Sequence, residues 1–136
     1  MTEVGEQLPE RKYHVTRADL VRYAGASGDT NPIHWSDRIA AAAGLPGVIA
    51  HGMLTMALAG RSLTEWTGDP GAIVEYGVRF ARPVVVPDDD AGLVLTVSGV
   101  VTEMRDDGRV GVELTALVGD EKVLTQARAV VRGPIE

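Results

Sequence analysis

Residues 52–66, GMLTMALAGRSLTEW, form the longest helix-compatible stretch of this 136-residue chain. The stretch is apolar on nearly every face of a helix until Arg61, which is typical of a helix that a β-sheet wraps. Gly68-Asp69-Pro70-Gly71 follows and predicts the end of the helix. We therefore expect one central helix whose apolar surface needs a sheet for its burial.

The second half of the chain predicts that sheet, because the apolar period changes from helical to two after Gly71. Asp106-Asp107-Gly108 and Gly119-Asp120 have the composition of hairpin turns. Residues 83–90, rich in proline and aspartate, indicate a longer exposed connection. Strands are expected where apolar and polar residues alternate, over residues 74–80, 93–98, 110–116 and 123–129.

The first half predicts a strand and two short helices before the central one. A strand is expected near Lys12–Val15. Thr16 forms a capping-box pattern with Asp19, which predicts a helix from about Arg17 to Ala26. Ser36 can cap a second short helix. This order of elements predicts an α+β fold, with a mostly antiparallel sheet around the long helix, in a single domain over residues 1–136.

Composition excludes several classes of function. The chain has 13 Lys and Arg against 19 Asp and Glu, so its net charge of −6 disfavours nucleic acid and anionic membranes as partners. It has no cysteine, which excludes disulfides, a thiolate nucleophile and cysteine-ligated metal sites, and fits the reducing cytoplasm. Residues 1–11 contain three glutamates and no apolar run, so no secretory signal is expected. Residues 39–60 carry no charge, but glycine and proline interrupt them, which indicates a loop and a buried helix rather than a membrane span.

The densest group of polar functional side chains lies in Ser27–His34. Pro32 disfavours the helical region for Asn31, so Asp29 and His34 are displayed on a loop whose reversal can bring them together. A carboxylate and an imidazole in one site suit general acid–base catalysis at neutral pH. The alternative is a structural one, in which Asp29 and Asn31 form a turn and His34 is a hydrogen-bonded core histidine.

A second group, Ala50-His51-Gly52-Met53-Leu54-Thr55, lies at the start of the central helix. Backbone N–H groups there can bind a carbonyl oxygen that becomes negative during a reaction, which makes the Gly52 N–H the candidate oxyanion donor. The alternative is an ordinary glycine at a helix start, with His51 and Thr55 serving nearby backbone groups. Asp29, His34 and His51 also have donor atoms suited to a mononuclear metal, although their spacing does not place all three on one ion. Six aromatic residues are expected in the core rather than against a ligand: Tyr13, Tyr23, Trp35, Trp66, Tyr76 and Phe80.

Residues 23–34 and 50–53 together resemble the signature of the MaoC-like, or (R)-specific enoyl hydratase, family. The resemblance continues at Gly5–Pro9, Gly68–Ala72 and Val78–Phe80, so it covers nearly the whole chain. It is greatest to the catalytic subunits of the heterodimeric (3R)-hydroxyacyl-ACP dehydratases of actinobacteria.

The resemblance implies a hot dog fold and reversible hydration of trans-2-enoyl thioesters to (3R)-3-hydroxyacyl thioesters, on ACP or CoA, without a metal or cofactor. It assigns Asp29 and His34 as the catalytic pair and Gly52 as the oxyanion glycine. Some hydratases carry a serine in the first turns of the central helix where this chain has Thr55, so Thr55, like Asn31 and His51, is given a supporting role.

The resemblance also implies a dimer, either of two copies or with a second hot dog subunit. Two other functions stay open. A hot dog thioesterase would hydrolyse the same substrates with a carboxylate. A non-catalytic acyl-binding subunit of a heterodimeric dehydratase would bind them without turnover, although the presence of both Asp29 and His34 argues against that role.

Overall fold

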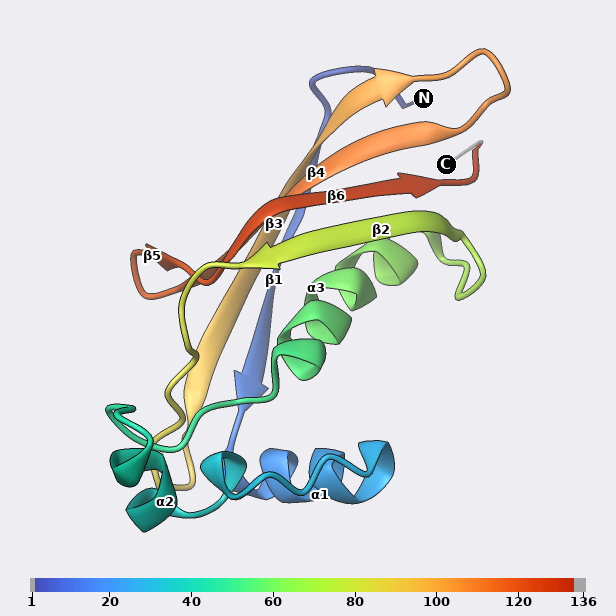
Figure 1. Cartoon of the computed structure of the whole chain (residues 1–136). Helices are drawn as coiled ribbons and strands as arrows, with labels where there is room; N and C mark the ends of the chain where they lie inside the picture. Colours follow the sequence, from blue (N-terminus) through green and yellow to red (C-terminus); the bar gives the residue numbers. More distant parts are fainter. Residues whose placement is uncertain (1, 134–136) are drawn as a thin grey trace.

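One antiparallel sheet lies against a single long helix in the computed structural model, which describes residues 2–133 (Figure 1). The strand order is β1-β3-β4-β6-β2, and the short β5 pairs with β4. The elements in chain order are β1 (Gln7–Val15), α1 (Arg17–Ser27), the 3₁₀ turn η1 (Pro32–His34), α2 (Asp37–Ala42), α3 (Gly52–Thr67), β2 (Ile73–Phe80), β3 (Leu93–Met104), β4 (Val110–Val118), β5 (Glu121–Lys122) and β6 (Leu124–Val131). A sheet curved around one helix is the hot dog arrangement, so the predicted α+β fold is confirmed.

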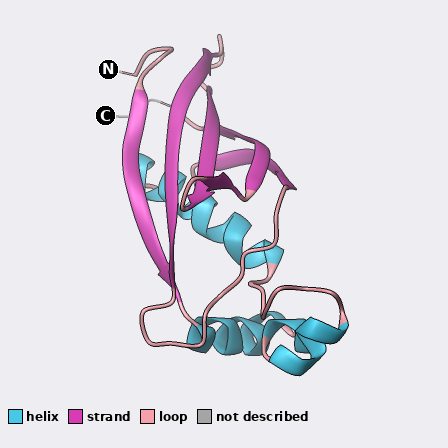
Figure 2. Ribbon diagram, turned by 90° about the vertical axis from the view of Figure 1, so that its left-hand side faces the viewer, coloured by secondary structure: helices cyan, strands magenta, loops and turns pink. Residues whose placement is uncertain are grey.

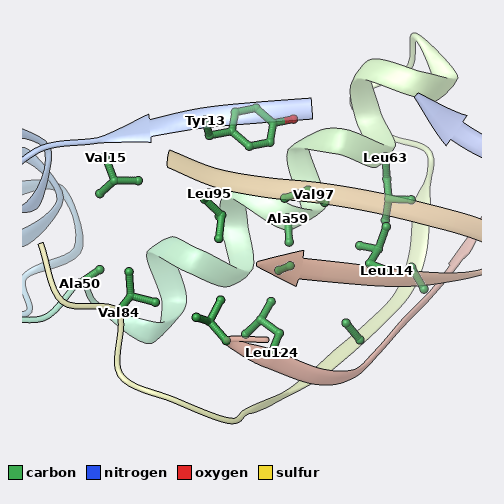
Figure 3. Close-up of a cluster of buried hydrophobic side chains, with 14 of the residues drawn as sticks. Tyr13, Val15, Ala50, Ala59, Leu63, Val84, Leu95, Val97, Leu114 and Leu124 are labelled. Atoms are coloured by element: carbon green, nitrogen blue, oxygen red, sulfur yellow. The ribbon is translucent and has the colours of Figure 1, made fainter. Parts of the chain in front are cut away.

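The core lies between the sheet and α3 (Figure 3). Leu95 and Val97 of β3 are almost fully buried, as is Leu63 of α3, with exposed fractions of 1%, 0% and 0%. Tyr76 of β2 packs against α3. Its ring lies 3.0 Å from where a Cβ at Gly60 would stand, and its hydroxyl donates to the Met56 carbonyl at 2.6 Å. A glycine at position 60 therefore lets β2 approach α3 closely.

The sheet covers only one side of α3. The buried face is formed by Thr55, Ala59, Gly60, Ser62 and Leu63. Ala57 and Arg61 on the opposite face are exposed, and Met53 in the first turn is 59% exposed. The central helix against a sheet is thus as predicted, and the curved sheet of a single copy is open on one side (Figure 2).

The two short helices lie together at the end of the sheet where α3 begins (Figure 2). Thr16 and Asp19 form the predicted capping box, with Asp19 Oδ2 accepting from the Thr16 N–H at 2.9 Å. Gly28 ends α1 in the left-handed conformation, with φ of 77°. Ser36 caps α2, as predicted, by accepting from the Ile39 N–H.

Several boundaries and burial predictions differ from the expectation. β1 begins at Gln7 rather than near Lys12, β3 continues to Met104, and β5 was not expected. Trp35 and Phe80 are 54% and 55% exposed, so the prediction that both lie in the core is wrong. None of the helices within residues 2–133 has the length and hydropathy that a membrane-spanning helix needs.

Candidate active site

Hydrogen bonds within the loop after α1 hold Asp29 in place. The Asp29 N–H donates to Ser27 Oγ at 3.2 Å, and Asp29 Oδ1 accepts from the Asn31 N–H at 3.2 Å. Asn31 in turn caps the 3₁₀ turn, because its Oδ1 accepts from the Ile33 N–H. The Asp29 side chain is 53% exposed, so its carboxylate is open to solvent and to a ligand. Asn31 thus has the loop-forming contacts predicted for it.

His34 is held on the opposite side of the loop. The residue is buried, with 7% of its surface exposed, and its Nδ1 lies 2.7 Å from the Ile49 carbonyl oxygen. A carbonyl can only accept, so Nδ1 carries the proton and Nε2 of the neutral ring is a free acceptor. The Ile49 N–H donates to the Ile33 carbonyl at 3.2 Å, so Ile49 is bound both to His34 and to the residue before it.

The loop brings Asp29 and His34 together, as the sequence predicts. His34 Nε2 and Asp29 Oδ2 lie 3.8 Å apart. This distance is too long for a direct hydrogen bond, but one water molecule can bond to both atoms. The pair therefore presents two acceptors to a water molecule that lies beside them.

His51 contacts both Asp29 and His34. It is 2% exposed, and its Nε2 lies 3.0 Å from the backbone carbonyl oxygen of Asp29. Its ring stacks on the ring of His34, with 3.7 Å between centroids and 21° between planes. Tyr23 meets it edge-on, with 4.8 Å between centroids.

Gly52 follows His51 and begins α3, beside a cavity of about 290 Å³. The Gly52 N–H has no intrahelical partner at this position, and no hydrogen bond from it is found within residues 2–133. Thr55, one turn further along, is 4% exposed and also lines the cavity. The remaining walls are mainly apolar and are formed by Ile49, Ala50, Phe80, Ala81, Arg82, Pro83, Val84 and Val123.

Asp29, His34 and His51 are also the one group of potential metal ligands found within residues 2–133, with ligand atoms within 4.8 Å of one another. Two of the four imidazole nitrogens face backbone carbonyls at hydrogen-bond distance and must carry protons in those contacts. Those two atoms are not free to bind a metal. The other nitrogen of each ring, His34 Nε2 and His51 Nδ1, carries no proton in this arrangement.

A family model described as MaoC like domain matches residues 2–118. The chain belongs to this family. Among curated relatives of this MaoC-like chain, 3-hydroxyacyl-thioester dehydratase X of Mycobacterium tuberculosis is 42% identical over 79 residues, which are 58% of this chain and 27% of the relative. The 3-hydroxybutyryl-CoA dehydratase of Methylorubrum extorquens is 33% identical over 124 residues, 90% of this chain and 76% of the relative.

Two solved structures extend the comparison. A MaoC-like dehydratase superposes with a TM-score of 0.94 at 40% identity, over 98% of this chain and 41% of that chain. The ChsH1-ChsH2 complex from Mycobacterium tuberculosis gives a TM-score of 0.85 at 26% identity, over 98% of this chain and 100% of the compared chain. The chain thus spans less than half of the first relative and of the first structure.

Sequence reasoning missed three contributors to the site. The Ile49 carbonyl orients His34, but a backbone carbonyl carries no residue-specific signal. Trp35 donates from Nε1 to the Thr30 carbonyl at 3.0 Å and closes the loop, although it was expected in the core. Phe80 lies over Gly52, with its ring 3.0 Å from where a Cβ would stand.

Proposed function

We propose that the protein catalyses the reversible hydration of trans-2-enoyl thioesters to (3R)-3-hydroxyacyl thioesters in fatty acid metabolism. The observation that supports this most is the 3.8 Å separation of His34 Nε2 and Asp29 Oδ2, which His51 contacts, together with the free N–H of Gly52, the residue after His51. Hydration needs a held water and a donor for the thioester oxygen, and these groups supply both. The relatives named as dehydratases agree with this reaction.

In the hydration direction, a water donates one hydrogen to His34 Nε2 and the other to Asp29 Oδ2. One of the pair takes a proton as the water oxygen attacks C3, and a proton is returned from the pair to C2, so water is added with no net release of protons. Negative charge passes to the thioester oxygen in between. The Gly52 N–H, at the positive end of α3, stabilises that charge by a hydrogen bond.

Asn31, His51 and Thr55 support this chemistry, and Asn31 and His51 do so without touching the reacting atoms. Asn31 holds the Asp29 loop through its backbone and side chain. Thr55 lines the cavity beside Gly52, and no hydrogen bond of its hydroxyl is found within residues 2–133, so it is the second candidate to bind the thioester oxygen. The reaction as proposed needs no metal or cofactor.

The active form is proposed to be a dimer, with a second copy or with a second hot dog subunit. β2 lies at the edge of the sheet, where its backbone groups can pair with another strand. Met53 and Phe80 add exposed apolar surface near the cavity. The proposed substrate is an acyl-ACP or an acyl-CoA, and a cytoplasmic location stays a prediction from the lack of cysteine.

The proposal is tested by assaying the purified chain, alone and with a candidate partner subunit, on short-chain to long-chain trans-2-enoyl thioesters of CoA and ACP. Loss of enoyl absorbance without release of free thiol is the expected result. Release of thiol would indicate a thioesterase instead. Binding without turnover, alone and with the partner, would indicate an acyl-binding subunit.

A further inference from the structure

His51 occupies a position that its local structure does not explain. It is the N-cap residue of α3, a position where a side-chain oxygen ordinarily accepts a hydrogen bond from the first turn. The His51 side chain makes no such bond. It is nevertheless among the largest fully buried side chains of the chain, so its contacts must lie elsewhere.

Those contacts are with the two proposed catalytic residues. The ring of His51 lies against the ring of His34 over most of one face, and its Nε2 donates to the Asp29 carbonyl. The two catalytic residues belong to one loop, whereas His51 is 22 residues from Asp29 in sequence. The ring therefore links the loop to the start of α3 and to the Gly52 N–H.

The hydrogen bonds also determine the proton positions on both rings. His34 carries its proton on Nδ1, facing Ile49, and His51 carries its proton on Nε2, facing Asp29. Nδ1 of His51 is then without a proton, and it is buried with no hydrogen-bond partner within residues 2–133. A buried polar atom left unpaired costs stability, so the ring is not there to stabilise the fold through Nδ1.

We propose that His51 is a positioning residue of the active site, an inference that rests on the proposed function. Its stacking fixes the plane of the His34 ring, and its Nε2–H fixes the backbone of Asp29. Together these contacts hold the 3.8 Å separation of the two atoms that bind the water. His51 touches neither substrate nor water.

Two variants separate the two contacts. His51→Gln keeps an amide donor the same number of bonds from Cα as Nε2, but removes the ring that stacks on His34. His51→Phe keeps a ring against His34 and Tyr23, but removes the donor to Asp29. Ser62→Ala is the matched control, because Ser62 is a buried residue of the same helix that donates to the Ala59 carbonyl at 2.6 Å. Ser62 lies about 15 Å further along the axis of α3 than Gly52.

We expect both His51 variants to fold and to lose kcat by roughly 10-fold to 10²-fold with little change in KM, as for misplacement of a catalytic group by up to about 1 Å. Ser62→Ala should keep the wild-type kcat. Folded His51→Gln and His51→Phe enzymes that both keep the wild-type kcat would overturn the proposal.

A second measurement does not depend on substrate. The chain has three histidines, of which His14 is exposed and serves as a reference, so ¹⁵N-histidine NMR of the full chain is readily assigned. His34 should carry its proton on Nδ1 and His51 on Nε2, and the His34 Nδ1–H signal should exchange faster in His51→Gln than in His51→Phe or Ser62→Ala. The opposite tautomers in the wild type, or an unchanged signal in His51→Gln, would refute the positioning role. An inactive wild type with the expected signals would instead count against the proposed reaction.

Discussion

Substitution of Gly52 by proline separates hydrogen bonding from steric access at the proposed oxyanion site. Proline removes the N–H, which at the first position of α3 has no partner in the helix. The backbone accepts the change, because proline suits the first turn of a helix and His51 already has the extended ψ of 132° that a residue before proline prefers. We expect a folded enzyme whose rate falls by about 10²-fold to 10³-fold, or about 2.7–4 kcal/mol of transition-state stabilisation.

Gly52→Ala is the matched control. A Cβ at Gly52 lies 3.0 Å from Phe80 Cε1 and 3.2 Å from Phe80 Cζ, and proline brings the same Cβ. Phe80 is 55% exposed, so its ring can move away by the few tenths of an ångström required. Alanine keeps the N–H and should weaken substrate binding more than turnover.

The measurements are kcat and KM for enoyl thioester hydration, with circular dichroism to show that both variants fold. A folded Gly52→Pro enzyme with near-normal turnover would mean that the thioester oxygen is stabilised elsewhere, and Thr55 would be tested next.

Three further predictions follow from the same structure. Asp29→Asn and His34→Ala should each reduce hydration by about 10²-fold to 10⁴-fold without loss of fold, and wild-type rates in both would refute the acid–base assignment. Light scattering of the active protein should give the mass of a dimer, and a fully active monomer would contradict this. Burial raises the pKa of Tyr76 to about 12, so the free energy of unfolding should be unaffected by this group below pH 10 and should fall as pH rises from 10 towards 12. Denaturant titrations across that range should show a smaller decline for Tyr76→Phe than for the wild type.

Elements whose signals are local could be predicted from the sequence. The capping box at Thr16 and the glycines at either end of α3 placed the helices to within a residue or two. The first half of β1 was missed, because a register shift between Leu8 and Arg11 breaks the alternation and includes Pro9, a residue tolerated at sheet edges and bulges. β5 has two residues, too few for any period to be detected.

In the candidate site, too, the local contacts could be predicted from the sequence and the non-local contacts could not. The Asp29–His34 loop is local, and its turn residues indicated that the two side chains approach each other. The contact between His51 and Asp29 joins positions 22 residues apart and is made to a backbone carbonyl, which no sequence pattern encodes. Phe80 continues the alternation of β2 but lies over Gly52 on the wall of the cavity, and so is exposed.

Residues 48–50 explain how the two halves of the proposed site keep their geometry. On one side the Ile49 N–H donates to the Ile33 carbonyl, and the Ile49 carbonyl accepts from His34 Nδ1. On the other side the Ala50 N–H donates to the Val84 carbonyl, and the Val48 carbonyl accepts from the Val86 N–H. One short backbone segment therefore holds the catalytic loop, leads directly into Gly52 and forms a cavity wall. Because residues 48–50 make these bonds with backbone atoms, their side chains and others of the cavity wall can change with substrate preference while the distance from the proposed acid–base pair to the proposed oxyanion donor stays the same.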